Sequence, residues 1–192
     1  MIIKETLREK KYIFETKPGL FSKDNIDSGS KLLIEKMDLK PNDIVMDLGC
    51  GYGVIGLVAA NLAYKGSVYM VDTDIRAIKY SRINAKLNKV DNIEIIASDG
   101  FEEIVHIPHK IIFDVVVSNP PTHLPKDTLV EFINGSKTFL KEEGKAYFVT
   151  EKRIMSFMKK EFEKVFGNFK EIAHDDHHVL FLVYKYDKLV QL

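Results

Sequence analysis

Apolar positions along the chain follow two patterns: short runs typical of buried strands and longer stretches with helical spacing. The short runs predict five strands, at residues 43–47, 67–72, 93–98, 113–118 and 145–150. Helical spacing before, between and after them predicts helices at residues 28–37, 54–63, 75–88, 129–140 and 154–166. Two further runs, 169–173 and 179–186, predict a closing hairpin. Because strands and helices alternate up to that hairpin, the pattern predicts one α/β domain with a largely parallel sheet.

A glycine loop follows the first predicted strand and leads into an apolar helix. Gly49, Gly51 and Gly53 allow a sharp turn and a close approach of the backbone to a ligand, and Gly56 allows the helix to pack closely on the sheet. Gly51, Gly53 and Gly56 satisfy the spacing G-x-G-x-x-G of dinucleotide-binding loops. Both NAD and S-adenosylmethionine (SAM) are therefore candidate cofactors. Asp47 favours SAM, because a carboxylate at the strand end pairs with an ammonium group and repels a pyrophosphate.

Two more carboxylates end predicted strands. The carboxyl ends of parallel strands meet at the edge where ligands bind, so Asp72 is expected to accept both ribose hydroxyls and Asp99 an adenine amino hydrogen. Asp72 at a strand end also suits a helix cap, although Thr73 or Asp74 suits that role better. The predicted cofactor contacts also include the neighbouring residues Cys50, Thr73 and Ser98, together with Asn119 at the end of the fourth predicted strand.

The fourth predicted strand leads into the sequence Asn119-Pro120-Pro121. Two consecutive prolines fix the backbone and remove two donors, which leaves the Pro120 carbonyl free to accept beside the Asn119 side-chain oxygen. A planar exocyclic amine or amide has a delocalised lone pair, and hydrogen bonds from its N–H groups to these acceptors favour the pyramidal form that attacks a sulfonium methyl. We therefore predict N-methylation at Asn119, Pro120 and Pro121, with catalysis by positioning and electrostatics rather than by a strong base.

Composition narrows the class of partner. The 192 residues, 45% of them hydrophobic, suffice for one domain with its own core. Basic and acidic residues balance at 28 each, so no global positive field points to nucleic acid or an anionic membrane. Within residues 1–26, however, basic residues outnumber acidic ones and alternate with aromatic ones, and residues 12–16 predict a strand or hairpin. Both an RNA-facing edge and an ordinary solvated hairpin fit this segment.

The single cysteine, Cys50, has no partner for a disulfide, which fits a reducing compartment. The longest apolar run is far below the ~20 residues that a spanning helix needs, and Met1 opens no signal-peptide pattern. We expect a cytoplasmic protein without a membrane partner; the sequence leaves its oligomeric state open.

The glycine loop with Asp47, the strand-end Asp72 and the Asn119-Pro120-Pro121 sequence together resemble the amino-directed class I SAM methyltransferases. Upstream, residues 19–22 (Gly-Leu-Phe-Ser) and 27–30 (Asp-Ser-Gly-Ser) resemble the small-subunit ribosomal RNA guanine-N2 methyltransferase C family and its single-domain archaeal relatives. The resemblance covers nearly the whole chain.

This resemblance implies a Rossmann-like sheet of seven mostly parallel strands, the last antiparallel, with helices on both faces. It implies one methyltransferase domain over residues 1–192, with 1–26 as a hairpin on the substrate side and 27–192 as the core. It also implies SAM as methyl donor and a guanine amino group in the RNA of the small ribosomal subunit as acceptor. Residue by residue, it assigns the methionine end of SAM to Asp47, Gly49 and Gly51, the ribose to Asp72, the adenine to Asp99, the target nitrogen to Asn119 and Pro120, and the mouth of the site to Phe21 and Ser22.

One position departs from the family pattern. Related enzymes place an aromatic residue after Asn-Pro-Pro, where it stacks on the substrate base, and this chain has Thr122. Thr122 and His123 remain predicted substrate contacts. Either His123, Phe21 or Tyr52 stacks on the substrate base instead, or the stacking on that base is weaker by ~1–3 kcal/mol.

Three alternative functions stay open: methylation of a glutamine side-chain amide in a protein, a non-catalytic SAM-binding RNA or assembly module, and an NAD oxidoreductase. No metal site is predicted, because the His and Asp residues at 174–178 share one short turn, where ligands tend to point apart.

Overall fold

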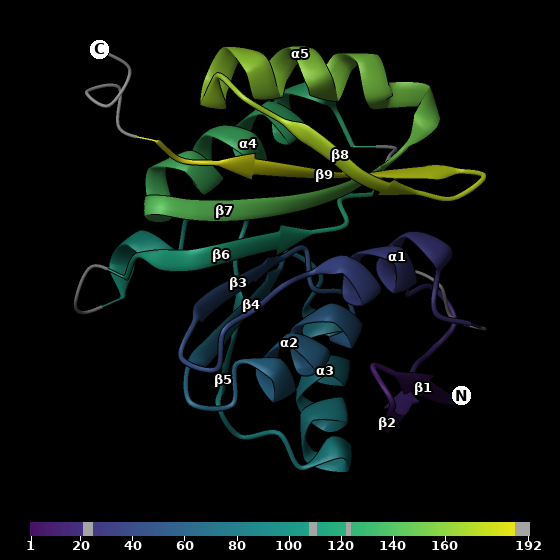
Figure 1. Cartoon of the computed structure of the whole chain (residues 1–192). Coiled ribbons are helices and arrows are strands. Elements are labelled where there is room, and N and C mark those ends of the chain that lie inside the picture. The colour runs from purple at the N-terminus through teal and green to yellow at the C-terminus, as the bar shows by residue number, and fades with distance from the viewer. Residues whose placement is uncertain (21–24, 108–110, 122–123, 187–192) are drawn as a thin grey trace.

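The computed structural model describes residues 1–20, 25–107, 111–121 and 124–186, and its main element is a seven-stranded sheet (Figure 1). The strands of this sheet are β3 (Ile44–Leu48), β4 (Ser67–Asp72), β5 (Ile93–Ala97), β6 (Phe113–Ser118), β7 (Leu140–Glu151), β8 (Lys170–His174) and β9 (His178–Tyr184). They lie in the order β5-β4-β3-β6-β7-β9-β8; the first five in chain order are parallel, and β9 is antiparallel to both of its neighbours. The predicted Rossmann-like sheet with an antiparallel last strand is therefore confirmed.

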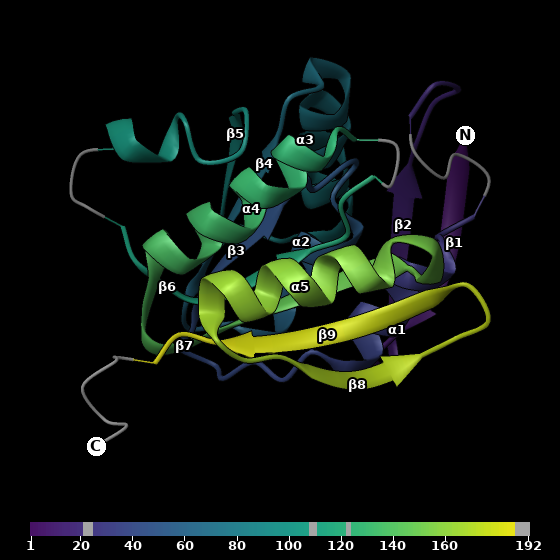
Figure 2. The ribbon, with the colours of Figure 1, turned by 90° about the horizontal axis from the view of Figure 1, so that it is seen from above.

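Helices cover both faces of this sheet (Figures 1 and 2). One face packs against α1 (Ser28–Lys36), α2 (Val54–Leu62) and α3 (Ile75–Asn88), and the other against α4 (Lys126–Phe139) and α5 (Met155–Phe166). Neighbouring strand residues alternate between the two layers, since Val45 belongs to the first core and Met46 to the second. Both layers are apolar, which explains why the central strands are continuous apolar runs in the sequence.

The central strands β3 and β6 are neighbours in the sheet although they are far apart in the chain. The strand order reverses between them, and such a reversal opens a crevice at the carboxyl ends of the strands. Leu48 pairs with Ser118 at the last position of the ladder, and the Ser118 hydroxyl donates to the Leu48 carbonyl at 2.7 Å. The segments that follow these two residues, the glycine loop and Asn119, thus start side by side.

The N-terminal segment forms the predicted hairpin, β1 (Ile2–Leu7) and β2 (Lys10–Glu15), joined by a two-residue turn with positive φ at both positions. Side chains of α3 occupy the backbone groups at the outer edge of β2. Asn84 both donates to and accepts from the Glu15 backbone, and Asn88 does the same with the Ile13 backbone. The hairpin is therefore fastened to the core rather than standing alone.

Two predicted boundaries differ from the structure. Strand β7 begins at Leu140 rather than at the predicted residue 145, because Leu140 pairs with Phe113 before an irregular step in the ladder, and regular pairing resumes at Lys145. Helix α4 begins at Lys126 rather than Leu129, because its first turn is polar and carries no apolar signal. The remaining predicted boundaries agree with the structure to within two residues. In the described part of the chain, no helix is both long and apolar enough to cross a membrane.

Candidate active site

A cavity of about 150 Å³ lies at the carboxyl ends of β3, β4, β5 and β6. Of the predicted site residues, the following line it: Gly49, Cys50, Gly51, Asp72, Thr73, Ser98, Asp99, Asn119 and Pro121. Three others, Asp47, Gly53 and Pro120, are not among its lining residues. Phe21, Ser22, Thr122 and His123 lie outside the described residues, so the predicted mouth of the site stays a prediction.

The glycine loop follows β3 and turns over the end of β4. The amides of Gly49 and Cys50 both donate to the Val71 carbonyl, at 3.0 and 2.9 Å. Gly51 has φ +56°, and a Cβ there would meet no atom within 4 Å, so the backbone is bare on the side that faces the cavity. A Cβ on Gly56 would lie 2.7 Å from Met70 and 2.8 Å from Asp47, which confirms that this glycine allows α2 to pack closely on the sheet.

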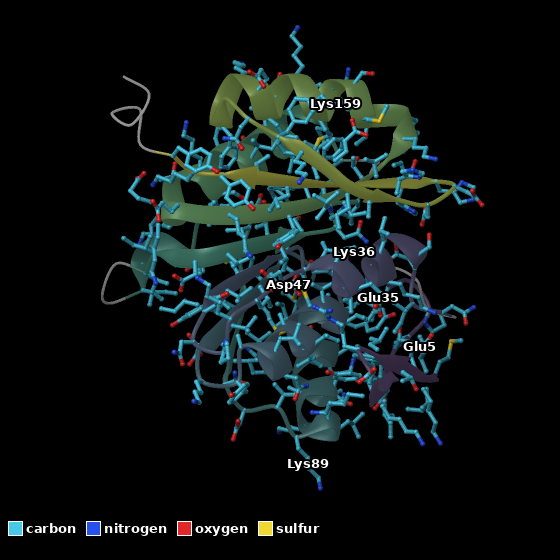
Figure 3. All side chains as sticks on the ribbon, in the orientation of Figure 1. Glu5, Glu35, Lys36, Asp47, Lys89 and Lys159 are labelled. Atoms are coloured by element: carbon cyan, nitrogen blue, oxygen red, sulfur yellow. The ribbon has the colours of Figure 1, made fainter. Side chains whose placement is uncertain are left out.

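Asp47 is fully buried at the end of β3, in the interior of the molecule (Figure 3). No described residue donates a hydrogen bond to either of its carboxylate oxygens. Burial raises its pKa to about 7, the nearby Gly56 amide offsets part of this rise, and the charge of Asp72 adds to it. The carboxylate is not on the cavity surface, and its predicted contact with the methionine end of SAM stays a prediction.

Asp72 lies on the cavity surface and already has backbone partners. Its carboxylate accepts from the Gly51 amide and from the Asp74 amide, each at 2.9 Å. Burial raises the pKa of this carboxyl as well, against those two hydrogen bonds. Asp74, not Asp72, caps α3, as the sequence favoured. Asp72 thus braces the glycine loop from the neighbouring strand.

The remaining predicted cofactor contacts differ in exposure. Asp99 and Thr73 are exposed, so their side chains are available to a ligand. The buried Ser98 hydroxyl is engaged locally, donating to the Gly100 carbonyl and accepting from the Glu103 amide, both at 3.1 Å. Burial also raises the pKa of the Cys50 thiol well above its usual value, which keeps it protonated and unreactive.

Asn119, at the end of β6, is held by residues that sequence reasoning assigned no role. Its side-chain nitrogen Nδ2 lies 3.1 Å from Oδ2 of Asp27 and 2.9 Å from Oγ of Ser30. Asp27 is the N-cap of α1 and accepts from the Gly29 amide at 2.9 Å. The sequence signals only the cap, because Asp-Ser-Gly-Ser before an apolar run is typical of a helix start; it gives no signal for the contact with Asn119.

The cluster at residues 174–178 forms the turn between β8 and β9. Asp175 accepts from the backbone amides of His177 and His178, while the His178 ring nitrogen Nδ1 lies 3.1 Å from the Ser28 hydroxyl. Within the described ranges, no three His, Cys, Asp or Glu side chains gather as metal ligands.

Comparison with known proteins bears on this geometry. The family model of the methyltransferase small domain matches residues 11–183. The chain belongs to this family. Its domain is a methyltransferase with SAM as methyl donor, and the residues present suit that cofactor: a bare glycine loop, a cavity at the switch point of the sheet, and buried carboxylates whose field favours a cation.

Individual relatives agree with the family. The chain is 32% identical over 148 residues to the uncharacterized protein YbxB of Bacillus subtilis, covering 77% of this chain and 72% of YbxB. It is 28% identical to the ribosomal RNA large subunit methyltransferase G of Alteromonas mediterranea, covering 88% of this chain and 42% of that protein. Among solved structures, the Thermus thermophilus 16S rRNA N2 G1207 methyltransferase in complex with AdoMet and guanosine matches with a TM-score of 0.83 at 24% identity, over 96% of this chain and 50% of that one. The chain thus spans half or less of these two rRNA methyltransferases.

Proposed function

We propose that this domain transfers a methyl group from SAM to an exocyclic amino group, N2 of a guanine in the RNA of the small ribosomal subunit. The observation that carries the proposal is the side chain of Asn119 on the cavity wall: its nitrogen is occupied by Asp27 and Ser30, and no described residue donates to its oxygen Oδ1. An unengaged carbonyl oxygen beside a SAM site is suited to accept a hydrogen bond from a planar amine. The printed names of two relatives support ribosomal RNA as the substrate, and one of them, a 16S rRNA N2 G1207 methyltransferase, supports a guanine amino group as the acceptor.

In this mechanism the chain positions the acceptor and performs no proton abstraction before attack. SAM, when bound, supplies a methyl group on a sulfonium. Asn119 Oδ1 and the Pro120 carbonyl would accept from the target N–H groups and hold the nitrogen pyramidal. As the new N–C bond forms and the S–C bond breaks, positive charge moves to the nitrogen, and one of its protons leaves to solvent. Gly49, Gly51 and Asp72 would hold the methionine and ribose parts, and Asp99 the adenine.

The charge distribution favours RNA over a protein amide. Residues 1–20 and 75–89 together carry ten basic and three acidic residues in a chain whose net charge is zero. The two segments pack together through Asn84 and Asn88. The basic side chains of this second segment are exposed: Arg76, Lys79, Arg82, Lys86 and Lys89. Lys89 extends away from the ribbon (Figure 3). Helix α3 begins shortly after Asp72 and Thr73, which line the cavity, although no residue of 1–20 or 75–89 lines it directly. We take residues 1–192 as one domain with this hairpin on its substrate side. A polyanion fits such a surface better than a neutral glutamine loop does.

The decisive experiment is transfer of a labelled methyl group from SAM to small ribosomal subunits that lack the native modification, with Asn119→Ala as control. Label recovered as N2-methylguanine from the wild type alone supports the proposal. Label in a protein band would instead assign the chain to glutamine-amide methylation, for which Asn119 is equally suited. Tight binding of SAM without label, together with full biological function of Asn119→Ala, would identify a non-catalytic module.

A further inference from the structure

Asp27 and Asn119 are 92 residues apart in the chain and meet at the cavity wall. A carboxylate accepts hydrogen bonds and donates none, so the Asn119 atom that faces it must be the NH2 nitrogen. Ser30 takes the second hydrogen of the same nitrogen, at 2.9 Å. With both N–H groups occupied, the carboxamide has one orientation, and Oδ1 is directed away from α1.

We infer that Asp27, assisted by Ser30, is the positioning residue that fixes the Asn119 carboxamide with its oxygen toward the acceptor. This inference rests on the proposed function, because it concerns how Asn119 is made ready to accept from the target amine. A free asparagine side chain presents oxygen and nitrogen about equally well, and a nitrogen facing the target would repel its N–H groups. The hydrogen bond from the Asn119 NH2 group to the Asp27 carboxylate also polarises the amide, which makes Oδ1 a stronger hydrogen-bond acceptor.

The helix cap explains why Asp27 stays in place. Its oxygen Oδ1 makes the shorter contact with Gly29, at 2.9 Å, whereas Oδ2 makes the shorter contact with Asn119, at 3.1 Å. A Cβ at position 29 would lie 3.0 Å from Asp27 Oδ1 and 3.0 Å from the His178 ring, so glycine permits this close approach. The Ser30 amide lies 3.3 Å from both oxygens and Asn119 Nδ2 lies 3.3 Å from Oδ1, so the oxygens differ in their shortest contact: Oδ1 serves mainly the α1 backbone and Oδ2 mainly Asn119.

This division of the two oxygens makes Asp27→Asn a sharp test. Asparagine is also a good N-cap, so α1 keeps its cap through the new side-chain oxygen and the fold is retained. When the side-chain oxygen of the new asparagine at position 27 accepts from the α1 backbone, its NH2 group faces Asn119. The Asn119 carboxamide must then turn its own oxygen toward α1. We expect kcat to fall about 100-fold, as for loss of one preorganised hydrogen bond in an active site, with an unchanged dissociation constant for SAM. Ser30→Ala, which removes one of two restraints, is expected to lower kcat about tenfold.

Two further variants separate positioning from folding. Ser28→Ala removes a hydroxyl from the same helical turn that contacts His178 rather than Asn119, and it should keep wild-type kcat. Asp27→Ser keeps a capping oxygen, but the serine side chain is too short to reach Asn119. The Asn119 carboxamide is then free to rotate rather than inverted, so the kcat of Asp27→Ser should lie between those of Ser30→Ala and Asp27→Asn. Thermal unfolding of each variant reports on the fold.

An NMR measurement tests the orientation without any methyl transfer. In ¹⁵N-labelled protein, the Asn119 side-chain NH2 signal is assigned by its loss in Asn119→Ala. We expect both of its proton resonances to move in Asp27→Asn, one chiefly in Ser30→Ala, and neither in Ser28→Ala. An Asn119 signal that is unchanged in Asp27→Asn, or wild-type kcat in that variant, would overturn the inference. If the wild-type protein methylates no RNA, the proposed function fails, but the NMR result still decides the orientation.

Discussion

The glycine loop in the cofactor half of the cavity is one short segment held mainly by backbone hydrogen bonds, whereas the acceptor half joins side chains from two distant parts of the chain. On the cofactor side, the loop at 49–53 is held by backbone hydrogen bonds to Val71 and by Asp72 on the adjacent strand. On the acceptor side, Asn119 depends on side chains of α1, Asp27 and Ser30. We conclude that the first half is specified by backbone geometry and the second by side-chain contacts, so variants should affect SAM affinity and turnover separately.

Asn119→Ala is expected to have the largest effect. It removes the acceptor on the cavity wall and should lower kcat on the order of 100-fold or more, comparable to loss of one preorganised hydrogen bond in an active site. Because the cofactor loop does not depend on Asn119, the dissociation constant for SAM should stay within about twofold of wild type. Single-turnover kinetics and calorimetry measure the two quantities. A parallel loss of SAM affinity would show that the halves are not independent.

Gly51→Ala should have the opposite effect to Asn119→Ala: it should weaken SAM affinity and leave kcat nearly unchanged. A Cβ at φ +56° is strained and would project into the cavity, so SAM affinity should weaken about tenfold or more, as expected for a strain of roughly 1–3 kcal/mol. Turnover at saturating SAM should change much less. The measurement is calorimetric titration with SAM.

Gly167→Ala is the matched control for that variant. Gly167 has φ +74°, also with no atom within 4 Å of a Cβ, but it follows α5 and does not line the cavity. It should lose thermal stability without any change in SAM affinity. Equal effects of the two variants on SAM binding would mean that Gly51 acts only through backbone strain.

Asp47→Asn tests the buried charge behind the loop. A cation in the cavity favours the ionised carboxylate, so wild-type SAM affinity should rise with pH below about 7, by up to about tenfold per pH unit, and level off above it, and Asp47→Asn should lack that component. Calorimetry in buffers of different ionisation enthalpy should detect release of a proton on binding. A pH dependence that is identical in both proteins would exclude Asp47 as its source.

The same group makes a prediction for the free protein. Its folded pKa of about 7 lies above its unfolded value, so the folded state holds the extra proton between about pH 4 and 7. The free energy of unfolding should therefore fall as the pH rises through that range, by an amount on the order of a few kcal/mol at most. Asp47→Asn should remove this loss. Urea unfolding at pH 5 and 8 measures the difference.

The comparison also explains what could be predicted from the sequence. The sheet, most element boundaries and the cofactor half follow from contiguous signals: apolar strands, spaced glycines and carboxylates at strand ends. Sequence reasoning missed the contacts of Asp27 with Asn119 and of Asn84 and Asn88 with β2, because these join polar side chains that are distant in the chain and leave no periodic pattern. The predicted contact of Asp47 with the cofactor stays a prediction, since its buried carboxylate does not line the cavity.

Lys10 and Lys11 at the start of β2 are expected to give the smallest effect, outside both halves of the cavity. They are exposed on the hairpin, and if they contact phosphates, replacing both with alanine should lower the slope of log affinity against log salt by about 1.4, at about 0.7 per phosphate on a single strand. At moderate salt this corresponds to a loss of RNA affinity of several-fold, with SAM affinity and kcat at saturating RNA unchanged. Lys160 and Lys164, exposed on α5 at the opposite face of the sheet, provide the control pair. If the control pair reduces the slope as much as the hairpin pair does, RNA binding is a property of total charge, and the hairpin is an ordinary solvated element rather than part of the acceptor side.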